Sequence, residues 1–136
     1  MTTTPALAAL GDEKFVSLTT YRRSGAGVPT TVWVGRDGDA LVVTTPTGSG
    51  KVKRLRNDAR VQLQPSSRRG AVDESVSPVD AVAEIVQDPG AVRRLGAVMA
   101  AKYGLEYRLV MGAERLLRRG APQRVMLRIT SGSEAA

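Results

Sequence analysis

With 136 residues, of which 42% are hydrophobic and 24% charged, the chain is long enough to bury one core and too apolar to be disordered throughout. It contains neither cysteine nor histidine, which excludes disulfides, thiolate nucleophiles, His-based catalytic triads and most zinc sites, so no metal is expected. The formal net charge of +7 favours an anionic partner, such as nucleic acid, a phosphorylated cofactor or an acidic membrane surface.

The N-terminal half has the residue pattern of a β-sheet. Runs of β-branched and aromatic residues are separated by turn residues, and the pair Asp37-Gly38 is typical of a tight hairpin. After a Gly-rich break, Val52 and Leu55 lie three positions apart, as on one side of a short helix whose other sides are basic. The predicted strands are Lys14–Arg22, Pro29–Gly35, Ala40–Thr45 and Ala59–Pro65, with a helix at Lys51–Asn57.

The C-terminal half is richer in helix. Asp73–Val79 is polar and contains a proline, which predicts a loop, whereas Asp80–Gln87 alternates as a strand does. Asp88-Pro89 is typical of an N-cap followed by proline at the first helical position, and Gly104 is typical of a helix end. The predicted elements are helices at Pro89–Tyr103 and Leu105–Arg119 and a last strand at Arg124–Thr130.

This order of elements predicts a mainly β fold. No β–α–β alternation suggests a parallel sheet, so an antiparallel barrel with helices packed outside it fits best. Residues 1–11 and 131–136 are small and polar enough to be frayed tails, which leaves residues 12–130 as one domain. No run approaches the roughly 18 apolar residues of a membrane span, and the first ten residues lack the pattern of a secretory leader, so a cytoplasmic location is expected.

The segment from Thr44 to Arg54 is the best candidate for a binding site. A strand ends there in hydroxyl side chains and glycines and then opens a basic helix, so backbone N–H groups, the helix dipole and Lys side chains could meet one anion. The nucleotide-binding P-loop is excluded, because its first glycine is missing and Val52 stands where Ser or Thr would bind Mg²⁺. An ordinary solvated basic helix is the alternative interpretation.

A wider set of motifs surrounds this segment: Leu18–Arg22, Val28–Val34, Asp37–Thr45, Ser49–Asn57 and Ala59–Val61. In this order and with these spacings they resemble the pyridoxamine 5'-phosphate oxidase-like superfamily of flavin-binding split barrels, and most closely its actinobacterial branch that uses coenzyme F420. The resemblance implies an antiparallel split β-barrel with flanking α-helices, of the FMN-binding type. It also implies a homodimer with two cofactor sites at the subunit interface.

The same resemblance implies cofactor-binding residues, carried over by position. They are Pro29, Thr30, Thr31 and Trp33 for the ring pocket, Thr44 and Thr45 for the cofactor's chain, Ser49, Lys51 and Lys53 for its phosphate, and Gln64 and Arg68 for the partner's cofactor. Trp33 is equally well explained as a core aromatic residue of an alternating strand. No catalytic residue can be named from the sequence.

Three functions remain open from the sequence. The first is an oxidoreductase that transfers a hydride between coenzyme F420, or alternatively FMN, and a conjugated small molecule, because in a chain without His or Cys the cofactor would supply the chemistry. The second is a non-catalytic cofactor or tetrapyrrole-binding protein. The third and weakest is a nucleic-acid binder, since aromatic residues make up only 4% of the chain and binding would be mainly electrostatic.

Overall fold

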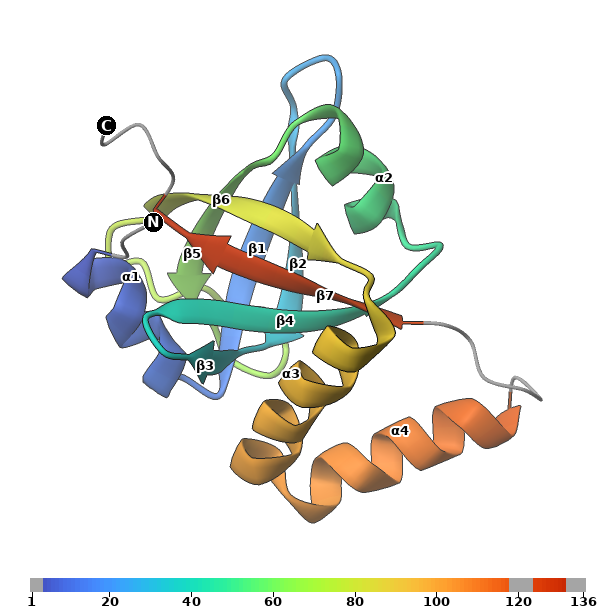
Figure 1. Ribbon diagram of the computed structural model, residues 1–136. Helices are drawn as coiled ribbons and strands as arrows, with labels where there is room; N and C mark the ends of the chain where they lie inside the picture. The colour runs from blue at the N-terminus through green and yellow to red at the C-terminus, as the bar shows by residue number, and fades with distance from the viewer. Residues whose placement is uncertain (1–3, 118–123, 132–136) are drawn as a thin grey trace.

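The computed structural model describes residues 4–117 and 124–131, and these residues form one curled antiparallel sheet with helices around it (Figure 1). The helices are α1 (Pro5–Ala9), the 3₁₀ turn η1 (Leu10–Asp12), α2 (Gly50–Asn57), α3 (Pro89–Tyr103) and α4 (Leu105–Leu117). The strands are β1 (Phe15–Tyr21), β2 (Gly27–Trp33), β3 (Gly35–Asp37), β4 (Ala40–Pro46), β5 (Arg60–Pro65), β6 (Val79–Val86) and β7 (Arg124–Thr130).

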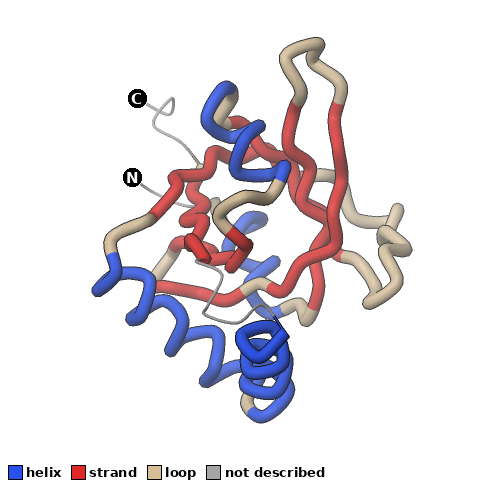
Figure 2. Tube along the Cα trace, turned by 90° about the vertical axis from the view of Figure 1, so that its right-hand side faces the viewer, coloured by secondary structure: helices blue, strands red, loops and turns tan. Residues whose placement is uncertain are grey.

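The sheet closes on itself because its two edge strands are neighbours in the chain. Its strand order is β2-β1-β5-β6-β7-β4-β3, so β2 and β3 lie at opposite edges although Val34 alone separates them. The chain can pass from one edge to the other through a single residue only if the sheet curls, and Figure 2 shows the strands wrapping around a common interior. This arrangement confirms the predicted mainly β, antiparallel split barrel.

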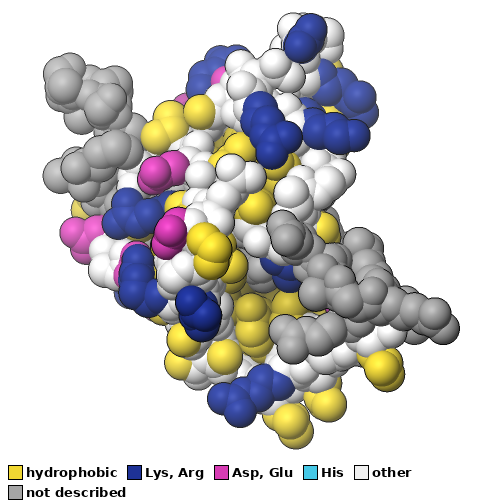
Figure 3. All heavy atoms as spheres, turned by 45° about the vertical axis from the view of Figure 1, so that its right-hand side comes forward, with side chains coloured by type: hydrophobic (Ala, Val, Ile, Leu, Met, Phe, Trp, Pro, Cys, Tyr) yellow, Lys and Arg dark blue, Asp and Glu magenta, His cyan; other side chains and the backbone are white. Residues whose placement is uncertain are grey.

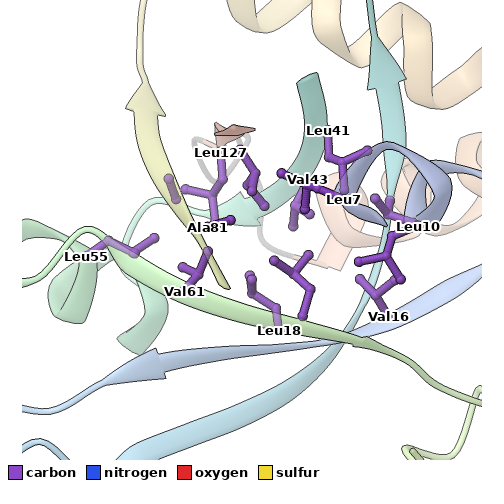
Figure 4. Close-up of a cluster of buried hydrophobic side chains, with 14 residues drawn as sticks. Leu7, Leu10, Val16, Leu18, Leu41, Val43, Leu55, Val61, Ala81 and Leu127 are labelled. Atoms are coloured by element: carbon purple, nitrogen blue, oxygen red, sulfur yellow. The ribbon is translucent and has the colours of Figure 1, made fainter. Parts of the chain in front are cut away.

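The interior of the barrel is filled by alternating side chains from most of its strands. Val16 and Leu18 of β1, Leu41 and Val43 of β4 and Leu127 of β7 are fully buried and meet in one cluster (Figure 4). Because successive side chains of a strand point to opposite faces, this spacing of two places the apolar residues on the inner face. The inner residues of each strand thus lie two positions apart, while β4 and β7 are also buried on their outer face.

The N-terminal segment corrects one prediction. Residues 1–11 were expected to be a frayed tail, but α1 and η1 lie against the barrel, and Leu7 and Leu10 are 0% and 3% exposed within its core. The Thr4 hydroxyl caps α1 by accepting from the Leu7 amide at 3.3 Å, and Pro5 occupies the first helical turn. The burial of these two leucines, three positions apart, at the end of the barrel holds this short helix in place. Residues 1–3 and most of the expected C-terminal tail, 132–136, lie outside the described residues.

A second, smaller core lies on the outer face of the sheet. Val42 of β4 and Met126 of β7 pack there against Leu95 and Met99 of α3. Gly35 belongs to this contact, since a Cβ at that position would lie 2.9 Å from the Met99 sulfur. The outer face of β4 and β7 is therefore covered by α3, and this places the end of α3 and the start of α4 beside β2 and β3.

The remaining predicted elements agree with the structure to within two residues, with one exception, and the predicted end of the last helix at Arg119 lies outside the described residues. The strand predicted at Pro29–Gly35 is divided: β2 ends at Trp33, and Gly35 already pairs with β4 as part of β3. The predicted Asp-Gly hairpin is confirmed, with Asp37 paired to Ala40 and Gly38 at a φ of 62°. No described helix is long and apolar enough to cross a membrane.

Candidate functional site

A pocket of about 250 Å³ lies where the ends of β2 and β4 meet the starts of α2 and β7. Five of the residues predicted from the sequence line it together: Thr31, Trp33, Thr44, Thr45 and Lys51. The opposite wall comes from α4, through Val110, Met111 and Glu114, and Arg124 of β7 completes it. The pocket therefore combines an aromatic and aliphatic wall with a few polar groups, which is the usual composition of a ligand site.

Hydroxyl groups line the pocket where β4 ends. Thr44 and Thr45 are 9% and 1% exposed, and the Thr45 hydroxyl donates to the Ser49 hydroxyl oxygen at 3.1 Å. Ser49 is the N-cap of α2, because its hydroxyl also accepts from the Val52 amide at 3.4 Å. Ser49 is thus bonded within the chain, and it fixes the start of α2 beside the two threonines.

Lys51 brings a partly desolvated positive charge to the pocket. It lies in the first turn of α2, where the helix dipole is positive. Burial lowers the pKa of the Lys51 ammonium, and the guanidinium groups of Arg54 and Arg124 lower it further. Burial and the neighbouring guanidinium groups disfavour the charged ammonium, and a bound anion would stabilise it. Lys51 is therefore suited to bind a phosphate or carboxylate.

Arg124 and Glu114 form an ion pair inside the pocket, and neither residue was predicted from the sequence. The Arg124 Nη1 donates to the two Glu114 carboxylate oxygens at 2.8 and 2.6 Å, and its Nε donates to the Thr44 hydroxyl at 3.0 Å. One residue begins a strand and the other lies on a helix, and no local motif links them. Only the folding of α4 against the ends of β4 and β7 brings them together.

Trp33 packs with two tyrosines in an aromatic cluster at one side of the pocket. Its ring stacks on Tyr103 with centroids 5.0 Å apart and meets Tyr107 at 5.7 Å. The Tyr103 hydroxyl lies 2.8 Å from the Val34 carbonyl and 2.7 Å from that of Lys14, and it accepts from the Val34 amide at 3.0 Å. Burial raises the pKa of both tyrosines, so both stay neutral at ordinary pH. Trp33 is therefore both a packed aromatic residue and a wall of the pocket.

The other predicted residues lie outside the pocket lining. Pro29 and Lys53 are exposed, while the Thr30 hydroxyl donates to the Leu18 carbonyl at 3.4 Å. Gln64 donates to the Val76 carbonyl at 2.9 Å, and Arg68 pairs with Glu106 of α4 at 3.0 Å. Within one chain, Gln64 thus holds the loop at Val76 and Arg68 holds the start of α4, and Ser49 stays at the cap of α2.

A second hollow, of about 340 Å³, lies between the β1–β2 turn and the end of α2. Arg22, Arg23 and Arg60 line it, and Arg60 is paired with Asp58 at 2.8 Å. Figure 3 shows Lys and Arg side chains gathered in this upper region, whereas hydrophobic side chains gather around α3 and α4 below. The hollow is larger than the first pocket, but its lining has no aliphatic or aromatic side chain, so the first pocket is the better candidate for a ring-bearing ligand.

Comparison with known protein families assigns the whole described domain. The model of the pyridoxamine 5'-phosphate oxidase family matches residues 3–132. The chain belongs to this family. The predicted resemblance to pyridoxamine 5'-phosphate oxidase-like split barrels is thereby confirmed, and the pocket belongs to a pyridoxamine 5'-phosphate oxidase-like fold.

Solved structures share this pyridoxamine 5'-phosphate oxidase-like fold at low sequence identity. A conserved hypothetical protein of Mycobacterium tuberculosis is 22% identical with a TM-score of 0.63, over 90% of this chain and 75% of that one. An F420 reductase is 17% identical with a TM-score of 0.59, over 96% of both chains. The heme storage protein HutZ from Vibrio cholerae is 14% identical with a TM-score of 0.65, over 98% of this chain and 92% of that one. No curated protein matches the chain.

Proposed function

We propose that this protein is an oxidoreductase that binds coenzyme F420, or alternatively FMN, in the pocket between β2, β4, α2 and α4. The observation that carries the proposal is the convergence of Lys51, Arg124 and the hydroxyls of Thr44 and Thr45 beside the Trp33 wall. This set matches a ligand with an anionic group at one end and a flat ring at the other. Membership of the pyridoxamine 5'-phosphate oxidase family and the fold shared with an F420 reductase support the proposal.

The residues divide by chemistry into two groups. Lys51 and the start of α2 would hold the phosphate, and Thr31 and Trp33 would position the ring. The bound cofactor would supply hydride transfer to or from a conjugated small molecule. The Tyr103 hydroxyl is already bonded to backbone groups and its pKa is raised by burial, so water is the better proton source for the reaction.

The charge of α2 favours coenzyme F420 over FMN. Lys51, Lys53, Arg54 and Arg56 lie within six consecutive residues of α2, and this density suits a long, highly anionic cofactor tail. Titration of the purified protein with each cofactor, followed by fluorescence quenching, tests the proposal. We expect a lower dissociation constant for F420 at about 0.15 M salt, and equal or tighter binding of FMN would contradict the preference.

We also propose a homodimer in which a second copy completes the site. The pocket of about 250 Å³ is smaller than the roughly 300–1,000 Å³ that holds most cofactor-sized ligands. Beside it α4 exposes Leu105, Leu109 and Leu116 at 71%, 62% and 80%. A two-fold partner that covers these leucines would enclose the ligand and bury apolar surface. Light scattering at micromolar concentration tests this, with a dimer mass expected.

A second candidate function is ligand binding without turnover. The fold is shared with a heme storage protein. Apart from Lys51 and from Glu114, which is paired with Arg124, the pocket lining contains no ionisable side chain positioned for proton transfer. Turnover of the reduced cofactor with a panel of conjugated substrates separates the two functions. Binding of F420 or FMN with no oxidation by any substrate would favour a carrier.

A further inference from the structure

Arg124 is held in one orientation inside the pocket by partners on two sides. Its Nε donates to the Thr44 hydroxyl at 3.0 Å, and its Nη1 donates to both oxygens of Glu114. Among the ion pairs of the described residues, this is the one in which both side chains are less than a quarter exposed, at 18% for Arg124 and 22% for Glu114. The guanidinium group is therefore preorganised toward an anion within the pocket.

Glu114 has the chemistry of that anion. A carboxylate accepts from a guanidinium group in the same planar, bidentate way as a phosphate or a ligand carboxylate does. It is the one acidic residue of the pocket lining, where it is paired with Arg124 and shares the pocket with a second cation, Lys51. Without it, the pocket would hold two uncompensated positive charges next to the hydroxyls of Thr44 and Thr45.

Apart from the pair of Glu114 with Arg124, the ion pairs of the described residues that hold α4 lie in its first turn. α4 turns back from α3 at Gly104, whose φ is 60°, and Glu106 in its first turn pairs with Lys14 and Arg68 at 3.3 and 3.0 Å. Along its length Leu109 and Val110 are 62% and 45% exposed. Figure 1 shows α4 as the outermost helix of the molecule. A shift of α4 that frees Glu114 would therefore break few buried contacts.

We propose that Arg124, Thr44 and Lys51 form an anion-binding subsite that Glu114 occupies in the free protein. A phosphate or carboxylate of the ligand then binds by displacing Glu114 from Arg124, so Glu114 lowers the affinity for anions. The inference rests on the pocket of the proposed function, but it does not depend on which cofactor fills that pocket.

Inorganic pyrophosphate is the probe, and calorimetric titration gives its dissociation constant for the full chain. Glu114→Gln keeps the shape of the side chain and removes the competing charge, and we expect it to bind pyrophosphate about tenfold more tightly than the unchanged protein. Adding Arg124→Gln to this variant should abolish the gain. Glu106→Gln is the matched control, because it removes one negative charge from the same helix outside the pocket, and it should alter the affinity by less than about twofold.

Two results would overturn the proposal. Equal gains in Glu114→Gln and Glu106→Gln would mean that net charge alone matters, and no gain in Glu114→Gln would mean that Glu114 does not compete. Circular dichroism verifies folding, and Glu114→Ala repeats the test if the Gln variant does not fold. Parallel titrations with F420 and FMN separate the two proposals. If Glu114→Gln binds pyrophosphate more tightly but neither cofactor binds, the subsite is retained and the proposed cofactor is rejected. If a cofactor binds but Glu114→Gln shows no gain in pyrophosphate affinity, the cofactor is retained and the role of Glu114 is rejected.

Discussion

At the scale of single residues, the fold gives Lys51 and Lys53 different surroundings although they are two positions apart on α2. Lys51 lines the pocket with Thr44 and Thr45, whereas Lys53 is exposed. A hydrogen bond to a charged group is worth more where water is partly excluded. The contribution of each lysine to anion binding is therefore expected to differ, although the sequence places both in the same basic helix.

Lys51→Ala is expected to weaken cofactor binding by about 10- to 100-fold, because it removes a charged hydrogen bond to phosphate. Lys53→Ala should weaken binding less, and Arg93→Ala, at an exposed position of α3, should leave it nearly unchanged. Dissociation constants at two salt concentrations, with circular dichroism to verify folding, measure the three effects. Equal losses in all three variants would mean that binding is only diffuse attraction to a basic surface.

The affinity for an anionic cofactor is expected to depend on pH through Lys51. In the free protein the pKa of Lys51 lies below its ordinary value of 10.5, and a bound anion raises it again. Binding thus takes up a proton when the pH lies between these two pKa values, and affinity falls as the pH rises through this window.

Dissociation constants measured from about pH 7 to about pH 10.5 test this, with Lys51→Arg as the control. Arginine stays charged over the whole range, so the dependence should flatten in that variant. An unchanged pH profile in Lys51→Arg would assign the dependence to another group.

At the scale of elements, α1 and α4 differ in how far their apolar side chains are buried. α1 spans five residues but buries Leu7 completely in the barrel core, whereas α4 spans 13 residues and leaves four large apolar side chains exposed. Burial rather than length decides what each helix contributes to stability, since isolated short helices are unstable in water. α1 therefore belongs to the folded core, and α4 is available for contacts outside it.

Leu7→Ala is expected to lower the free energy of unfolding by about 2–5 kcal/mol, as for other large-to-small changes in a packed core. Ala6→Ser, at an exposed position of the same helix, should change it by less than about 0.5 kcal/mol. Denaturation in urea measures both values. A loss below about 1 kcal/mol for Leu7→Ala would restore the interpretation of residues 4–11 as a loosely attached tail.

At the scale of the whole molecule, basic side chains and exposed leucines gather on different elements, although α3 and α4 also carry basic side chains. Basic side chains gather over α2 and the β1–β2 turn, and exposed leucines gather on α4 next to the pocket (Figure 3). An exposed apolar face of this kind usually marks a contact with another chain. The proposed dimer uses the apolar face and leaves the basic one open to anions.

Changing Leu109 and Leu116 together to Glu is expected to convert a dimer to a monomer and to weaken cofactor binding, because two charges cannot be buried against a partner without compensation. Val76→Glu, at a partly exposed loop position with 37% exposure, should leave the mass unchanged. Light scattering and cofactor titration on the same samples measure both effects. A monomeric variant with unchanged affinity would show that one chain completes the site by itself.

Apart from α1, η1 and β3, the sequence alone predicts the strands and the helices, because these depend on residues two to four positions apart. Val16 and Leu18, two positions apart, define the buried face of β1, and the Gly-rich break before Lys51 marks the end of a strand and the start of a helix. Five of the predicted site residues fall together for the same reason: each lies at the end of β2 or β4 or at the start of α2.

Three features depend on closure of the sheet, and only the tertiary structure shows them. Val34 separates β2 from β3 because the chain has to cross between the two edges, and a run of β-branched residues gives no sign of this break. The burial of Leu7 needs the open end of the barrel, and the pairing of Arg124 with Glu114 needs α4 to turn at Gly104 toward the ends of β4 and β7. These contacts join segments that lie far apart in the chain and that only the closed barrel brings together. Their free energy comes from burying the surfaces of these segments against one another, and no local pattern of residues specifies which surfaces will meet.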